Sequence, residues 1–179
     1  MEYAYEAIDV LTAPLSPVDQ DVLAYWERQR GAAFAPTWYS FRLEDLPPTA
    51  LPWCSVVDVL RDPVDFQFRF WGTVRRDLLG QEITGELLSR LRGPVGQATW
   101  EENMIVVEAG KPIYFRLHAV RDGHEPLNYG VLRLPLSDDG EAVDKIFTMM
   151  YWPDLRAQMH RLHGTVPPLA NLQMSRSAD

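Results

Sequence analysis

Histidines and carboxylates are the side chains of this 179-residue chain that could carry acid–base chemistry. His118 falls inside a predicted strand, and a small hydrolase or isomerase with a pocket around it would need a second group with a shifted pKa. Asp58 is the nearest candidate for that role, but no spacing in the sequence pairs it with His118. The sequence also lacks a Gly-x-Ser-x-Gly, a phosphate-loop and a dinucleotide-binding glycine pattern. We therefore expect no catalysis, with a small α+β cone-shaped enzyme as the alternative.

Two further histidines suggest a metal, but the pattern is incomplete. His160 and His163 are three residues apart in a predicted last helix, so they could share a helix face and a metal ion. No Cys or His pair elsewhere completes the ligand set, and histidines near a helix C-terminus also interact well with the helix dipole. His118 could ligate haem, although a lone strand histidine is more often simply hydrogen-bonded. The sequence predicts no metal and no haem, and leaves an unknown small-molecule ligand open.

Composition limits the classes of partner and compartment. The net charge of −8 disfavours nonspecific binding to nucleic acid or to an anionic membrane. No apolar run reaches the length of a membrane-spanning helix, and the N-terminus does not read as a secretory signal. Cys54 is the only cysteine and lies in an apolar run, so we expect a buried small hydrophobe and a reducing cytoplasm.

One face of the predicted sheet mixes aromatic rings with arginines. Tyr114, Arg116 and His118 alternate with apolar residues in one strand, and Arg69 and Trp71 alternate with phenylalanines in another. This face could line a pocket for a small anionic or amphipathic ligand. The more common arrangement is a solvated outer face, with the arginine stems covering the rings.

If a pocket exists, we expect it between the sheet and the helical segment 74–109. The predicted lining is Trp71, Met104, Tyr114, His118 and Tyr129, with Arg69 or Arg116 as the anion anchor. The bulk of Trp71 argues the other way, because this ring could fill the space outright. A filled site would make the protein an interaction module without a small-molecule ligand.

A first helix must pack against this sheet or against a second subunit. Ser16 can cap it, Pro17 suits its first position, and Gly31 suits the residue after its end. An apolar stripe along it includes Val22, Tyr25 and Trp26. The stripe could cover the sheet or form a dimer interface, and we expect a homodimer.

The remaining pattern predicts an α+β domain with a five-stranded antiparallel sheet. The strand candidates span 54–60, 66–73, 113–120, 128–136 and 143–151, with Asp62-Pro63 making a hairpin turn. A longer helix is predicted between Pro94 and Gly110, with its apolar stripe on Trp100, Met104 and Val107. A last helix begins near Pro153.

Several short motifs, in a fixed order, resemble a stand-alone proteobacterial PAS-domain family. They are Tyr25-Trp26 with Arg30-Gly31, Leu46-Pro47 with Leu51-Pro52, Phe68-Arg69-Phe70-Trp71-Gly72-Thr73, Gly80 with Ile83-Thr84-Gly85, and Leu134-Pro135-Leu136-Ser137-Asp138-Asp139-Gly140. The resemblance spans roughly residues 22 to 151. It implies a PAS fold with strand order 2-1-5-4-3, a sensory or regulatory role and no catalytic residues. Trp71 departs from the family, where a smaller aliphatic residue is expected.

Together these observations predict three parts. Residues 1–15 are a flexible N-terminal segment or an added edge segment, 16–152 form the PAS-like domain, and 153–179 form a C-terminal helix and a disordered tail. The predicted function is a cytoplasmic sensory or regulatory domain that acts through a ligand or a signalling partner. A protein-interaction adaptor without a ligand is a further alternative.

Overall fold

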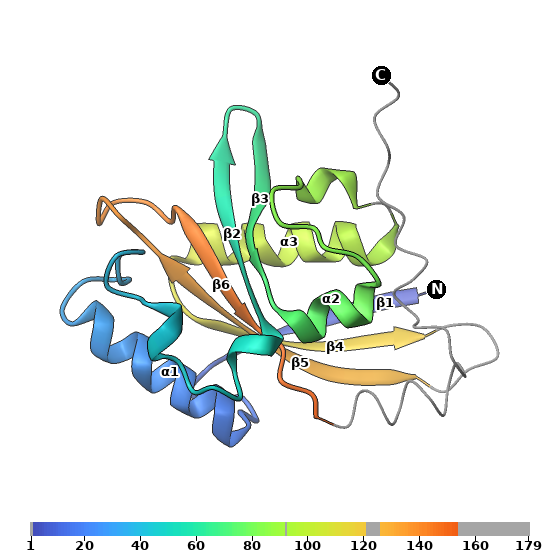
Figure 1. The fold of residues 1–179 in the computed structure, drawn as a ribbon, viewed down its shortest axis with the longest axis horizontal. Coiled ribbons are helices and arrows are strands. Elements are labelled where there is room, and N and C mark those ends of the chain that lie inside the picture. Colours follow the sequence, from blue (N-terminus) through green and yellow to red (C-terminus); the bar gives the residue numbers. More distant parts are fainter. Residues whose placement is uncertain (1, 92, 121–125, 154–179) are drawn as a thin grey trace.

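The computed structural model describes residues 2–91, 93–120 and 126–153, and its centre is one antiparallel sheet (Figure 1). Within these residues the sheet has six strands in the order β1-β4-β5-β6-β2-β3. The strands are β1 (Glu2–Asp9), β2 (Cys54–Arg61), β3 (Val64–Trp71), β4 (Ile113–Val120), β5 (Leu127–Leu136) and β6 (Lys145–Met149). The α-helices are α1 (Pro17–Arg30), α2 (Thr73–Leu79) and α3 (Pro94–Ala109). Short 3₁₀ helices lie at Leu43–Asp45, Leu51–Trp53 and Leu88–Arg90.

The five predicted strands are all present, and a sixth strand precedes them. Counted without β1, the order from one edge to the other is the predicted 2-1-5-4-3. β1 pairs with β4 over its whole length, so the five-strand prediction was one strand short. Residues 2–9 are therefore an edge strand and not a flexible segment. Its Tyr3 and Tyr5 alternate with smaller or charged residues and pack on the core, which is the period of a half-buried strand. The predicted last helix and tail lie outside the described residues.

The first helix begins as its sequence predicts and packs on its own sheet. Ser16 and Asp19 form a reciprocal capping box, and Gly31 ends the helix at a φ of 54°. Val22, Tyr25 and Trp26 are buried against β2, β5 and β6, and the Trp26 Nε1–H donates to the carbonyl of Pro135 at 2.8 Å. Of the two roles that the sequence allowed for this stripe, the structure therefore shows the first: the three side chains cover the sheet of their own chain and are not free to form a dimer interface.

Two separate cores lie on the two faces of the sheet. One core fills the space between α1 and the sheet, and the other lies beneath α3 (Figure 1). The stripe predicted for α3 is not its most buried face. Trp100, Met104 and Val107 are only partly buried, whereas Glu102 and Asn103 are fully buried. Burial of a charged and a polar residue in place of the apolar stripe marks the α3 face of the sheet as unusual.

An irregularity in β3 changes which way its last side chains point. Val56 pairs with Phe70 and Val57 pairs with Phe68, so Arg69 has no partner on β2. Such a bulge breaks the alternation of a strand. Phe66 and Phe68 face α3 as one side of the predicted strand, but Phe70 joins the α1 core and Trp71 returns to the α3 side. The regular alternation predicted for this strand, with phenylalanines on one face and Arg69 and Trp71 on the other, is therefore wrong beyond Phe68.

Candidate functional site

A cavity of about 90 Å³ lies between the sheet and the segment that contains α2 and α3. Every strand of the sheet contributes to its wall, including β1 through Tyr3. Its apolar lining consists of Val57, Phe68, Leu91, Val95, Leu117, Val131 and Met150. The remaining wall is polar, and most of that polar surface is fully buried within the protein. An apolar pocket with a few convergent polar groups is the usual form of a small-molecule site.

A row of polar or hydrogen-bonding side chains crosses the sheet on the cavity side. Strand register places Trp71 opposite Ser55, Ser55 opposite Thr148, and Thr148 opposite Arg133, across β3, β2, β6 and β5. Ser55, Thr148 and Arg133 are each buried. Because neighbouring residues of one register row have adjacent side chains, these groups form a continuous polar strip beneath α3.

Arg133 is the centre of a buried hydrogen-bond network. Its Nε and Nη2 donate to Glu102 Oε2 at 3.1 and 2.5 Å, and its Nη1 donates to Asn103 Oδ1 at 2.8 Å and to Thr148 Oγ1 at 2.9 Å. Burial raises the pKa of Glu102, and the guanidinium of Arg133 offsets this only in part. The network therefore fixes the helix to the sheet around a charge pair that is costly to bury.

A second buried guanidinium, from Arg75 of α2, borders the same cavity. Its Nε donates to the carbonyl of Trp53 at 2.7 Å, and the group lies 5.2 Å from the centre of the Trp71 ring. Burial, with the nearby charge of Arg133, lowers the pKa of Arg75 to about 10. Arg75 is therefore still cationic at neutral pH.

Four buried polar atoms of this wall have no hydrogen-bond partner among the described residues. They are Trp71 Nε1, Arg75 Nη2, Glu102 Oε1 and Asn103 Nδ2. All four residues line the cavity. Native proteins leave few buried polar groups unpaired, because each costs about 1–3 kcal/mol. Their gathering around one cavity indicates a place where a bound molecule can complete the hydrogen bonds.

Two tyrosines close one end of the cavity. The hydroxyl groups of Tyr3 and Tyr129 lie 3.1 Å apart, and the Tyr129 ring stacks on Trp152 with ring centres 5.0 Å apart. Burial raises the pKa of Tyr129 to about 12 and also raises that of Tyr3. Both phenols are therefore neutral at pH 7 and serve as hydrogen-bonding groups only.

The cavity includes two of the seven side chains predicted to line it. Trp71 and Tyr129 line the wall, and Trp71 leaves a cavity beside it rather than filling the space. Met104 packs against the same core without reaching the cavity. Arg69 is also absent from the wall, since it sits at the bulge, is exposed, and pairs with Asp58 at 2.7 Å.

The three predicted residues of β4 point away from the cavity, so this part of the prediction is wrong. In β4 it is Phe115 and Leu117 that face α3, and the alternation of the strand puts Tyr114, Arg116 and His118 on the other face. Tyr114 belongs to the α1 core, Arg116 pairs with Glu6 at 2.9 Å, and His118 is exposed with its Nδ1 2.7 Å from Asn128 Oδ1. These three residues do share one face of β4, as predicted, but Trp71, which was predicted to lie on the same face of the sheet, lies on the cavity side, so that grouping is wrong.

These positions weigh against the alternative chemistries. His118 and Asp58 lie on β4 and β2, which β5 and β6 separate, and neither lines the cavity. His118 cannot ligate haem bound there. Among the described residues no three His, Cys, Asp or Glu side chains come together as a metal site would require, while His160 and His163 lie outside those residues. Cys54 is buried, and burial raises the pKa of its thiol to about 12, which makes it unreactive.

The polar wall was missed because each of its members looks ordinary in the sequence. Ser55, Thr148 and Arg133 are single polar residues inside otherwise apolar strand segments. Glu102 and Asn103 follow another glutamate and read as the solvent side of a helix. The one available signal was the polar interruption of three strands that are central in the predicted strand order, since central strands are covered on both faces.

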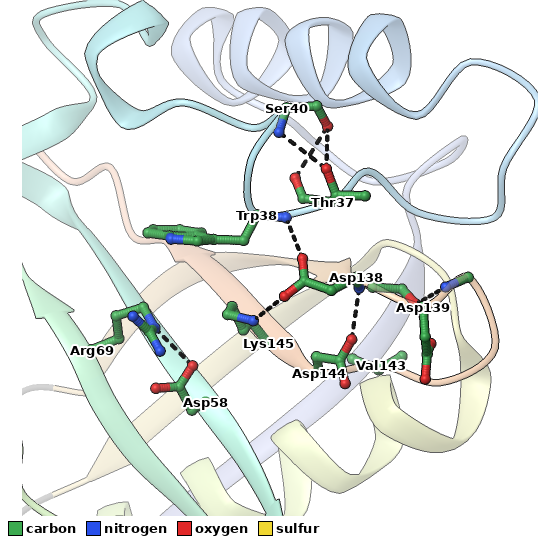
Figure 2. A network of polar contacts seen from close by, with 12 residues as sticks. Thr37, Trp38, Ser40, Asp58, Arg69, Asp138, Asp139, Val143, Asp144 and Lys145 are labelled. Atoms are coloured by element: carbon green, nitrogen blue, oxygen red, sulfur yellow. Dashed lines mark hydrogen bonds and ion pairs between the residues drawn. The ribbon is translucent and has the colours of Figure 1, made fainter.

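A second polar network lies on the α1 side of the sheet (Figure 2). Asp138, in the turn between β5 and β6, accepts hydrogen bonds from the Trp38 backbone at 2.8 Å and from Lys145 Nζ at 2.6 Å. Burial alone would raise the pKa of Asp138, but these bonds outweigh it and hold the pKa below its ordinary value. Nearby, Arg69 lies 5.7 Å from the centre of the Trp38 ring. Each of these groups has a partner, so this network is structural and ties the loop after α1 to the sheet.

A solved structure of an RNA-binding light-oxygen-voltage receptor resembles this chain with a TM-score of 0.44 and 10% identity, over 84% of this chain. This chain spans only 38% of that receptor chain. No curated protein matches the sequence. Among the described residues no helix is long and apolar enough to cross a membrane.

The family assignment rests on the sequence itself. A model of the PAS domain matches residues 15–157, which include every described element except β1. The match covers most of the chain, and the observed strand order is the one that the PAS resemblance implied. The chain therefore belongs to the PAS domain family, whose members are typically sensory domains.

Proposed function

We propose that this chain is a PAS-type sensory domain that binds a small molecule in the cavity beneath α3 and passes the signal to a protein partner. The single observation that carries the proposal is that four residues, each with an unpartnered buried polar atom, line one cavity. A domain selected only for stability would gain by replacing such groups with apolar ones. A ligand that pairs with them removes the penalty and is thereby recognised.

The geometry also suggests how a ligand would change the protein. Glu102 and Asn103 belong to α3, Arg75 to α2, and their neighbours to the sheet. A ligand held between these elements would alter how the helices sit on the sheet, and a population shift of this kind can be read by a partner. The alternative function, a protein-interaction adaptor without a ligand, does not account for the unpartnered polar atoms of the cavity wall.

Mass spectrometry of small molecules released on denaturation tests the proposal. Wild type should release a compound at near-stoichiometric amounts, or should bind one from a metabolite extract. Thr99→Phe, which places a ring in the cavity from α3, should release and bind none. Gln97→Phe, on the exposed side of the same helix, is the matched control and should behave as wild type. The proposal would be overturned if wild type and both variants captured the same amount of a small molecule, or if none of the three proteins captured any.

We also propose that the chain forms a homodimer and is cytoplasmic. Because Val22, Tyr25 and Trp26 are buried within the chain, the dimer interface would consist of other residues. The exposed outer edge of β1 is one surface that could pair with a second copy. Light scattering across a concentration series would decide whether a dimer forms.

A further inference from the structure

Resting on the proposed function, we propose that the ligand of this cavity is a small carboxylate anion held by the guanidinium of Arg75. The indole N–H of Trp71 and the amide of Asn103 are the neighbouring donors. The short apolar part of the ligand would lie against Val57, Leu117 and Val131.

The charged groups of the cavity wall favour an anion as the ligand. Two buried guanidinium groups, Arg75 and Arg133, face at most one carboxylate, Glu102, among the described residues that line the cavity. The charge of Arg133 is paired with that of Glu102 through two hydrogen bonds to Oε2. Among the described residues, Arg75 has no carboxylate partner and keeps one unpaired nitrogen. An uncompensated buried cation is strongly unfavourable, so an anion at this position would be stabilised.

The unpartnered atoms of the cavity wall are mostly hydrogen-bond donors. Three of the unpartnered atoms are donors, namely Trp71 Nε1, Arg75 Nη2 and Asn103 Nδ2. Only one, Glu102 Oε1, is a carboxyl oxygen. A carboxylate has two oxygens and about four acceptor positions, which matches a wall rich in donors. A cation or an amine would place further donors against the donors already there.

The volume of the cavity limits the size of the ligand. A cavity of about 90 Å³ is too small for a nucleotide or a flavin. Pockets that hold larger ligands usually measure about 300–1,000 Å³. A carboxylate with a short aliphatic tail fits these limits, since the tail meets the apolar wall and the head meets the donors.

Butyrate and butyramide are suitable probes, because they have nearly the same shape and differ in charge. Binding to the full chain would be followed by ligand-observed NMR and by thermal stabilisation at pH 7. We expect butyrate to bind at least tenfold more tightly than butyramide, which reflects the greater strength of hydrogen bonds to charged groups. Prior removal of any retained molecule by unfolding and refolding keeps the site available.

A charge series within the wall makes the test specific. Asn103→Asp keeps the shape and the acceptor for Arg133 but supplies an internal anion, so it should weaken butyrate about tenfold or more and weaken butyramide much less. Glu102→Gln removes the one carboxylate among the described residues that line the cavity, so it should strengthen butyrate. Trp71→Phe removes one unpaired donor and keeps the ring, so it should weaken butyrate with little change in stability. Gln97→Glu adds the same charge on the exposed side of α3 and should leave both affinities within twofold.

The outcomes separate this inference from the proposed function. Equal or tighter binding of butyramide, with loss of both probes in Thr99→Phe, would overturn the anion inference and leave a small-molecule site. Failure of both probes to bind wild type would also overturn the inference, and the release experiment would then decide the proposed function alone. If Asn103→Asp fails to fold, the opposite effects expected of Glu102→Gln and Trp71→Phe still decide.

Discussion

At the scale of single residues, buried polar groups separate the two faces of the sheet. On the α1 side, Asp138 accepts hydrogen bonds from Lys145 and from the Trp38 backbone, which fixes the loop after α1 to the sheet (Figure 2). On the α3 side, Arg75 and Glu102 retain unpaired atoms despite complete or nearly complete burial. The same residue types are therefore structural on one face and available for recognition on the other.

Trp26 provides the clearest test of the α1 core. Its side chain is 1% exposed and donates to the carbonyl of Pro135. We expect Trp26→Ala to lower the free energy of unfolding by about 3–5 kcal/mol, as measured by urea denaturation, because it leaves a large cavity. Tyr39→Ala is the control, since this aromatic ring is 92% exposed and its loss should change stability by less than about 0.5 kcal/mol. Equal stability of wild type and Trp26→Ala would refute the packing of α1 described here.

Asp138 gives a prediction that depends on pH. Its pKa is lower in the folded chain than its ordinary value of 3.8, so folding favours the ionised form. The stabilisation is therefore complete at pH values above the unfolded pKa, and it is lost as the pH falls through the lowered folded pKa. Asp138→Asn should cost about 1 kcal/mol at pH 7, a modest value because half of the Asp138 side chain is exposed.

The same comparison at acid pH provides the check. Wild type and Asp138→Asn should converge in stability below the folded pKa of Asp138, because the wild-type carboxyl is then neutral too. Urea titrations at several pH values would measure this. A difference that stays constant down to acid pH would show that the loss is not electrostatic.

At the scale of elements, the bulge in β3 decides which rings reach the cavity. Because Arg69 has no partner on β2, Phe68 and Trp71 both face α3 although they are three residues apart. A regular strand would send one of them to the α1 side. The bulge therefore places Trp71 above Arg75 and beside the polar row.

Deletion of single residues in β3 tests this role. Deleting Arg69 removes the unpaired residue and leaves Phe68 opposite Val57 and Phe70 opposite Val56, so the fold should survive with a loss of about 1 kcal/mol from its exposed ion pair. Deleting Gln67 instead turns the buried Phe66 toward the other face and should cost about 3–5 kcal/mol. Urea denaturation and two-dimensional NMR spectra would distinguish the two. Similar losses for both deletions would rule out the bulge assignment.

At the scale of the whole molecule, the PAS domain carries an additional strand. The family match begins at residue 15, so β1 lies outside it, yet β1 pairs along the full length of β4 and brings Tyr3 to the cavity. The cavity of this protein is thus closed partly by a segment that the family does not supply. The sheet edge that β1 covers would otherwise be the exposed edge of β4.

Removal of residues 1–9 tests the contribution of β1. The truncated chain should remain folded, because its core elements belong to the family match, but lose about 2–4 kcal/mol with the packing of two partly buried tyrosines. Hydrogen exchange should accelerate selectively in β4, which loses its neighbour. Glu6→Gln, which removes only an exposed ion pair with Arg116, is the control and should have little effect. Complete unfolding on truncation, or unchanged exchange in β4, would contradict this view.

Local chemistry made much of the fold predictable from the sequence. The cap at Ser16, the stop at Gly31, the hairpin at Asp62-Pro63 and the turn at Ser137–Gly140 each depend on residues close together in the chain. The order of these elements was enough to anticipate a PAS sheet, and Trp26 was correctly expected to be buried. Such features are set by backbone preferences and by short-range hydrogen bonds.

Only the tertiary structure decided which of two equivalent faces borders the cavity. Alternation in β4 grouped Tyr114, Arg116 and His118 on one face correctly. The same pattern does not say which of the two faces lies toward α3, and only the packing of α3 on the sheet decides this. The bulge at Arg69, the pairing of β1 with β4, and the burial of Glu102 against Arg133 all depend on residues far apart in the chain. A polar residue in an apolar run shows its role only when register places it beside other polar residues, and that register is set by the whole sheet.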